Sequence, residues 1–352
     1  MDVASNFTNV SFARHSCVPQ SEKHPDADKE CALEAIEDVE AVVGTLTRVA
    51  EQMAKPLMTI VHSCPSRDAV ANASLALAKL SSTNQTCDIL LEQGVAKIAA
   101  SMFPEKPSIL EGPMGAKHIM DEVYDVEAKN KRDAEVDQLV SLDASAFRLV
   151  ASLCRTVKGR QAVQTSGMMR RCVERFHLSG GVKGVDLVCR GEIACVFART
   201  ANAHTVESGT AGSANDYILN PNYNTVALLV ELVREGSKFY RRARFWAAFA
   251  LAELCNDTVR VVPIVAKWKG VPALVQIVKD YTRGGGVDPR GIPQPLLRPV
   301  LMALMRICKF PMGGYTSLII EAEARQPLAA IASNVRLQVE YRDVKDREPL
   351  GR

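Results

Sequence analysis

Apolar residues recur at helical spacing along most of the chain, and this pattern predicts where the helices begin. From Cys31 to Ser63 they step by three and four positions, which places them on one face of a helix. They are Leu33, Ile36, Val39, Val43, Leu46, Val49 and Met53. Residues 1–30 mix Ser, Asn, Pro, His and charged residues without this spacing. We therefore expect a flexible leader over 1–30 and N-terminal capping helices over 31–64.

An apolar triplet with the spacing i, i+4, i+7 recurs along the rest of the chain and marks one face of a helix each time. The copies are Ala73/Leu77/Leu80, Ala146/Val150/Leu153, Cys189/Ile193/Val196, Ala247/Leu251/Leu254 and Val300/Leu304/Ile307. A second apolar helix follows each triplet, and in three copies a glycine (Gly94, Gly167 or Gly270) opens a third apolar stretch. Glycine tolerates the positive φ or the close backbone approach of a sharp turn between helices. The predicted unit is helix, turn, helix, glycine, helix.

Three stretches of this unit, 76–94, 160–167 and 248–275, resemble armadillo repeats, with HEAT-like arrays as the nearest alternative. The resemblance implies an all-α fold, an armadillo-like right-handed α-superhelix (an α-solenoid) of about five degenerate repeats over residues 65–340. The copies are spaced irregularly compared with the roughly 40 to 47 residues of a typical unit, which predicts insertions. Polar or glycine-rich segments near 104–142, 203–224 and 283–295 are predicted to be these insertions, and 341–352 is a charged C-terminal tail.

Composition narrows the class of protein without naming a partner. The 352 residues are 47% apolar and 24% charged, as in ordinary soluble globular chains. The net charge of +3, from 43 basic and 40 acidic residues, gives no reason to expect a nucleic acid partner. Ten cysteines without a CxxC pair are predicted to be reduced core thiols. Because no apolar run has the length of a signal or a membrane span, we expect a cytoplasmic or cytoskeleton-associated protein.

The motifs of catalysis and cofactor binding are missing from the sequence. The run Gly284–Gly286 lacks the GK[ST] of a phosphate-binding loop, and no G-x-S-x-G motif occurs. His15 with Cys17, and His62 with Cys64, each have ligand-type spacing, but neither has a second pair. We therefore expect no metal, no cofactor, no catalytic residues and no enzymatic activity. An active site assembled on the inserted loops remains the alternative.

Candidate binding residues follow from the resemblance, because armadillo arrays bind extended partners along a concave groove lined by the third helix of each unit. Those helices are predicted to begin near Gly94, Gly167, Val226, Gly270 and Pro327. Their polar positions are Lys97, Arg170, Arg171, Glu174, Glu231, Arg234, Gln276 and Lys279. A solvated helix face has the same composition, and this is the alternative interpretation.

A second candidate surface is the segment Lys238–Trp246, where cations alternate with aromatic residues. Arg241, Arg242 and Arg244 suit an anionic partner, and the aromatic rings suit stacking. The alternative, which we favour, places the aromatic rings in the core and the cations in solvent.

Taken together, these patterns predict a non-catalytic interaction scaffold or adaptor with a protein partner. A chaperone cofactor of the armadillo type is the alternative within binding proteins. The sequence leaves the identity of the partner and the oligomeric state open.

Overall fold

A computed structural model of the chain describes residues 25–103, 142–178, 185–201, 214–234, 241–283, 296–310 and 314–333, without the side chains of 25–39, 185–186 and 241. Every regular element in these ranges is an α-helix, as the sequence predicts. The chain divides into two compact units, Met1–Leu46 and Thr47–Arg352.

The first helix, α1 (Pro25–Ser63), is one continuous helix that starts inside the predicted leader and replaces the predicted capping helices. Proline is favoured at the first helical position, because its ring fixes φ and its missing N–H is not needed there. Ala50, Ala54 and Val61 of α1 are buried. The remainder of the predicted leader, 1–24, and the predicted tail, 341–352, lie outside the described residues.

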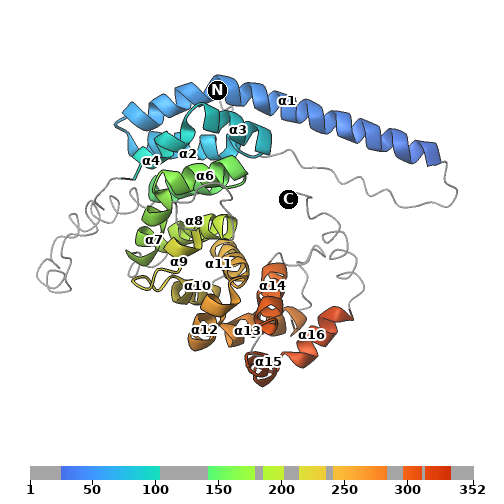
Figure 1. Cartoon of the computed structure of the whole chain (residues 1–352). Coiled ribbons are helices and arrows are strands. Elements are labelled where there is room, and N and C mark those ends of the chain that lie inside the picture. The colour runs from blue at the N-terminus through green and yellow to red at the C-terminus, as the bar shows by residue number, and fades with distance from the viewer. Residues whose placement is uncertain are drawn as a thin grey trace, which may run out of the picture. The chain divides into compact units, whose positions relative to one another are not determined.

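After α1 in the chain, the described helices form five consecutive sets of three, most of which are labelled in Figure 1. The first helices of the sets are α2 (Arg67–Leu80), a helix over residues 142–153, α8 (Val185–Thr200), α11 (Arg241–Leu254) and α14 (Leu297–Cys308). The second helices are α3 (Asn84–Glu92), α6 (Val157–Thr165), α9 (Ala214–Ile218), α12 (Thr258–Lys267) and α15 (Thr316–Glu321). The third helices are α4 (Val95–Ser101), α7 (Met168–Leu178), α10 (Thr225–Arg234), α13 (Gly270–Arg283) and α16 (Arg325–Ala332). All third helices begin within two residues of the predicted positions.

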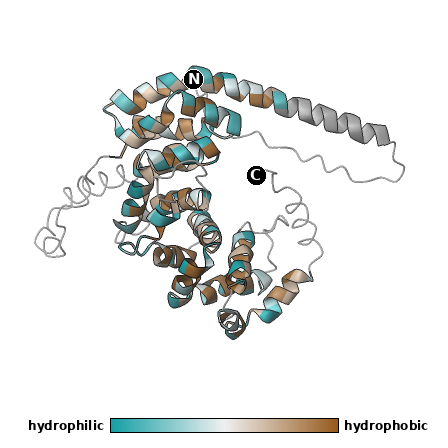
Figure 2. Ribbon diagram, viewed as in Figure 1, coloured by the Kyte–Doolittle hydropathy of each residue, from teal (hydrophilic) through white to brown (hydrophobic). Residues whose placement is uncertain are grey.

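The apolar triplets lie on the first helices and form part of a common core. Eight triplet residues that we expect in the core are buried: Leu77, Val150, Leu153, Ile193, Leu251, Leu254, Leu304 and Ile307. Leu80, at the end of its helix, is only partly buried and packs against the edge of this core. Figure 2 shows that the helices of the unit Thr47–Arg352 carry both apolar and polar positions, as burial on one side requires.

Glycines open the third helices for two different reasons. Gly94 and Gly167 have φ of 92° and 74°, which only glycine adopts without strain. At Gly270 the positive φ of 57° belongs instead to the preceding residue, Lys269. Gly270 serves close packing, because a Cβ there would lie 2.6 Å from Cγ1 of Val265.

Most of the predicted insertions fall outside the described residues, at 104–141, 202–213 and 284–295. The second half of the insertion predicted near 203–224 differs from a loop, because it contains the helix α9. Ala214 and Ile218 of α9 are fully buried. These two buried apolar side chains anchor the five-residue helix, although the polar composition around it predicts a loop.

Candidate functional site

Within the unit Thr47–Arg352, first helices pack on first helices and third helices on third helices, in two rows that also contact each other. Helix α8 contacts α11, and α11 contacts α14, while α7, α10, α13 and α16 contact one another in the same consecutive manner. Figure 1 shows α8, α11 and α14 along the inner side of this unit, with α10, α12 and α13 on the other side. This corrects the prediction that the third helices line the inner side. Both kinds of helix carry apolar residues at helical spacing, so the presence of that spacing alone does not say which kind lies on the inner side.

Two adjacent first helices, α11 and α14, carry partly exposed apolar side chains. Phe249 of α11 and Met302 of α14 occupy equivalent positions, two residues after the first member of their triplets. Both are half-buried. Phe245 lies one turn before Phe249, and Met305, which is 49% exposed, lies about one turn after Met302. We call these four residues the α11–α14 face.

An aromatic cluster supports the α11 side of this face. The ring centroids of Phe245 and Trp246 are 5.0 Å apart, and each lies 6.0 Å from the centroid of Phe249. Trp246 packs against the hydrophobic core. The guanidinium carbon of Arg199, from α8, lies 5.0 Å from the Trp246 ring centroid, a cation–π contact. The rings are therefore held in place before any partner arrives.

Two cations of the predicted patch Lys238–Trp246, Arg242 and Arg244, have partners within the protein, and Lys238 lies outside the described residues. Arg242 Nε lies 2.8 Å from Oε1 of Glu192 and Arg242 Nη2 lies 3.0 Å from Oε2, a two-pronged ion pair. The hydrogen bond to Glu192 raises the pKa of Arg242. Arg244 donates from Nε to the carbonyl oxygen of Val233 at 2.7 Å. Arg241 is the first residue of α11, and its side chain lies outside the described residues. These contacts argue against a free cationic patch, but the packing interpretation is met only in part, because Phe245 and Trp246 are half-buried and not in the core.

Two predicted binding residues on third helices instead connect neighbouring repeats. Arg171 donates from Nη1 to the carbonyl oxygen of Ala100 at 2.9 Å and also to that of Phe103. Arg234 donates from Nη2 to the carbonyl oxygen of Trp268 at 2.5 Å. These carbonyls lie at or just beyond helix ends, where intrahelical donors run out, although the carbonyl oxygen of Ala100 also accepts from the backbone N–H of Phe103. Both arginines thus satisfy exposed backbone acceptors of the adjoining repeat.

The same kind of contact joins the first helices, and sequence reasoning missed it. Arg199 donates to the carbonyl oxygen of Ala151, and Arg306 donates to that of Ala252. Arg306 also lies 3.1 Å from Oε1 of Glu253. The acceptors are 48 and 54 residues away in the chain, so no local motif reveals these contacts.

The remaining candidates on third helices are more exposed to solvent. Arg170 forms an ion pair with Glu174 at 2.7 Å, and Gln276 Nε2 donates to Oδ1 of Asp280 at 2.7 Å. Such pairs within one helix contribute little to stability, so these side chains remain available to a partner. Two further candidates are exposed, Lys97 and Glu231.

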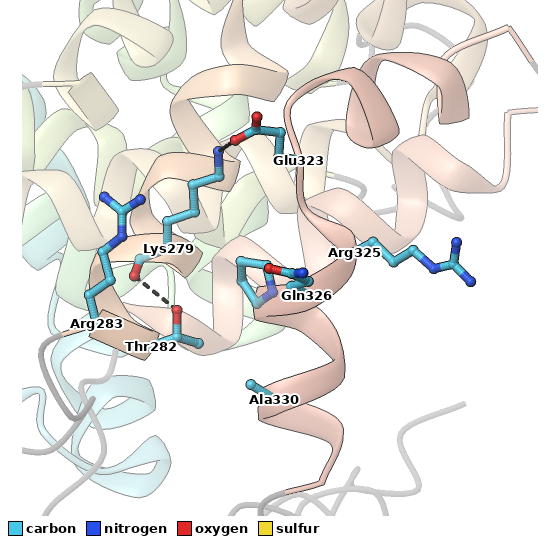
Figure 3. Close-up of a pocket in the computed structure, with 8 residues that line it drawn as sticks. Lys279, Thr282, Arg283, Glu323, Arg325, Gln326 and Ala330 are labelled. Carbon is cyan, nitrogen blue, oxygen red and sulfur yellow. Dashed lines mark hydrogen bonds and ion pairs between the residues drawn. The ribbon is translucent and has the colours of Figure 1, made fainter.

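The last candidate, Lys279, lines a cavity of about 580 Å³ between the end of α13 and the start of α16 (Figure 3). Lys279 Nζ lies 2.8 Å from Oε2 of Glu323, and this contact holds the pKa of Glu323 below its usual value. Arg283 and Arg325 also line the cavity, and Figure 3 shows the guanidinium of Arg325 directed away from Lys279. With three cations and one carboxylate, this cavity suits an acidic side chain better than a basic one.

The buried thiols have no features of reactive cysteines. The eight described cysteines are free, and six of them are buried. Burial raises the pKa of Cys195 and of Cys255 to about 12. Because the thiolate is the nucleophile, these groups are inert at neutral pH.

The described ranges contain no group of three or more His, Cys, Asp or Glu residues that could hold a metal ion. His62 and Cys64 are within these ranges, whereas His15 and Cys17 are outside them. No single described helix is long and apolar enough to cross a membrane; α12 and α13 reach that length only together and are bent by 76°.

Comparison with known proteins supports the fold. A designed armadillo repeat protein aligns with a TM-score of 0.50 and 12% identity, over 80% of this chain and 92% of that protein. Two engineered proteins align at 15% identity, one with a TM-score of 0.52 over 80% of this chain and 90% of its own. The other has a TM-score of 0.53 over 82% of this chain and 94% of its own. No family model and no curated protein matches the sequence. The chain has an armadillo-like repeat fold.

Proposed function

We propose that this protein is a non-catalytic interaction scaffold or adaptor that binds a protein partner along the inner side of its repeat array. The observation that carries this proposal is the α11–α14 face. Protein interfaces concentrate their binding energy in a few aromatic and other large apolar residues within a polar rim. Phe249, Met302 and the exposed Met305 have that character, and they lie on adjoining helices.

The polar residues beside the face indicate what kind of partner fits. Arg306 and Glu253 form an ion pair next to the methionines, and Arg298 is exposed on the same helix, α14. A partner segment with apolar side chains and charged flanks of both signs matches this arrangement. Because the charged groups lie at the rim, they favour correct alignment more than affinity.

The repeat fold also supports a binding role over a catalytic one. Each repeat contributes one short stretch of surface, and successive repeats extend it, so an array needs no reactive residue to function. We also propose a cytoplasmic location, which is supported by the free thiols among the described cysteines.

A pair of variants tests the proposal. Met305→Glu places a charge in the face, and Ile320→Glu places the same charge on α15 at a residue that is 64% exposed. Both residues are exposed, so the melting temperatures are expected to stay near that of the unmodified protein. Proteins captured from source-cell lysate are expected to be lost with Met305→Glu and kept with Ile320→Glu. Full retention of every captured protein by Met305→Glu would refute the proposal.

A further inference from the structure

Helix α1 carries a partly exposed apolar stripe beside the side that packs on the core. Val42, Met53 and Ile60 are 50%, 44% and 37% exposed, and Val49 is half-buried. At 100° per residue, this stripe lies roughly a quarter turn around the helix from the buried Ala50, Ala54 and Val61. Helix α1 therefore has one apolar side for the repeats and a second one without a covering element in the described residues.

The spacing of the stripe is that of a coiled coil. With Leu46 included, the apolar positions are 42, 46, 49, 53, 56 and 60, which alternate steps of four and three. Each of these positions is apolar, with Pro56 the residue least suited to a helix. A stripe with this period matches a second helix over several turns. Scattered exposed apolar residues need no explanation, but a continuous row of them indicates an interface.

We propose that the stripe pairs with the same stripe of a second copy of this chain, with the two helices antiparallel. A two-fold axis between Thr47 and Arg48 places Val42 of one copy opposite Met53 of the other. It also places Leu46 opposite Val49. The stripe is thus complementary to itself, as a symmetric dimer requires.

The charge distribution along α1 selects the antiparallel orientation. Residues 25–46 contain seven acidic residues and one basic residue, a net charge of −6. Residues 47–63 contain two basic residues and one acidic residue, a net charge of +1 with His neutral. Parallel helices would place the two acidic halves side by side, and their repulsion opposes pairing. Antiparallel helices place each acidic half beside the weakly basic half of the other copy.

The mass of the full-length chain in solution, measured by light scattering across a concentration series, tests the pairing. We expect a monomer–dimer equilibrium that Val42→Glu shifts towards monomer by about a hundredfold or more, because each dimer then buries two unpaired charges. Val259→Glu is the matched control, since Val259 is 69% exposed on α12. The proposal is overturned if the chain stays monomeric at every concentration, as expected if the chain's own residues or another protein cover the stripe. Equal weakening of the dimer by Val42→Glu and Val259→Glu also overturns the proposal.

Mixing charged variants tests the orientation. Copies with Val42→Glu and copies with Met53→Lys are each expected to dimerise poorly alone and to form a mixed dimer together, because positions 42 and 53 face each other. Copies with Val42→Glu and Val42→Lys are expected not to rescue each other. The antiparallel register would be overturned if the Val42→Glu and Val42→Lys copies formed a mixed dimer while the Val42→Glu and Met53→Lys copies did not. These measurements do not depend on the α11–α14 face.

Discussion

Removing Arg242 is the sharpest test of the contacts that hold the first helices together. The carboxylate of Glu192 is almost fully buried, with 4% of its side chain exposed, and both of its hydrogen bonds to described residues come from Arg242. Arg242→Ala therefore leaves a buried charge without its partner. If Arg242 served only an anionic ligand, its removal would not affect stability.

The size of the effect follows from the burial of the two partners. Breaking a buried ion pair by removing one partner costs about 3–5 kcal/mol. The Arg242 side chain is 54% exposed, so water reaches the space that it leaves and partly solvates Glu192. We therefore expect a loss near the lower limit, about 3 kcal/mol of unfolding free energy. In a chain of this size such a loss lowers the melting temperature by about 4 °C.

Urea and thermal denaturation of three variants measure this loss. Arg298→Ala is the control, because Arg298 is exposed on α14, and it is expected to change stability by less than about 0.5 kcal/mol. Adding Glu192→Gln to Arg242→Ala removes the buried charge and is expected to recover part of the loss. Equal stability of the Arg242→Ala and Arg298→Ala variants would refute the reasoning, and so would a double variant less stable than Arg242→Ala alone.

Three further outcomes follow from the packing. Leu251→Ala, at a fully buried triplet position, is expected to cost about 2–5 kcal/mol in urea denaturation, and a cost below about 1 kcal/mol would contradict a continuous core. Gly94→Ala is expected to cost about 1 kcal/mol, because only its φ resists a side chain, whereas Gly159→Ala is expected to cost clearly more, because its Cβ would lie 1.8 Å from the carbonyl oxygen of Leu153. Thiol titration is expected to find Cys308 reactive in the native protein and ten free thiols after denaturation with exchange blocked; markedly fewer would indicate a disulfide.

The fold could be predicted from the sequence because the apolar triplets repeat. The glycines before α4 and α7 mark sharp turns that almost any other residue would strain, so they identify the third helices directly. Helix α9 shows the limit of this reasoning, because the expected second helix of its repeat lies in a polar stretch where its two buried apolar residues, Ala214 and Ile218, give no periodic signal.

The roles of charged residues could be predicted only in part. Arg171 and Arg234 resemble solvent-facing cations in the sequence, yet each donates to carbonyls 71 and 34 residues away, respectively. Such acceptors are backbone atoms and have no sequence signature. The inner position of α11 and α14 depends on how the repeats stack, and the apolar period of a single helix does not encode it.

Site-specific photocrosslinking in the source cell tests most directly the claim that the inner side of the array binds a protein. A photoreactive amino acid replaces Met305 in one variant and Ile320 in the other, so that the same probe samples the α11–α14 face and an exposed residue on α15. The account predicts a discrete protein adduct from position 305 that is missing from position 320. Adducts of the same proteins from both positions, or no adduct from position 305, would contradict it.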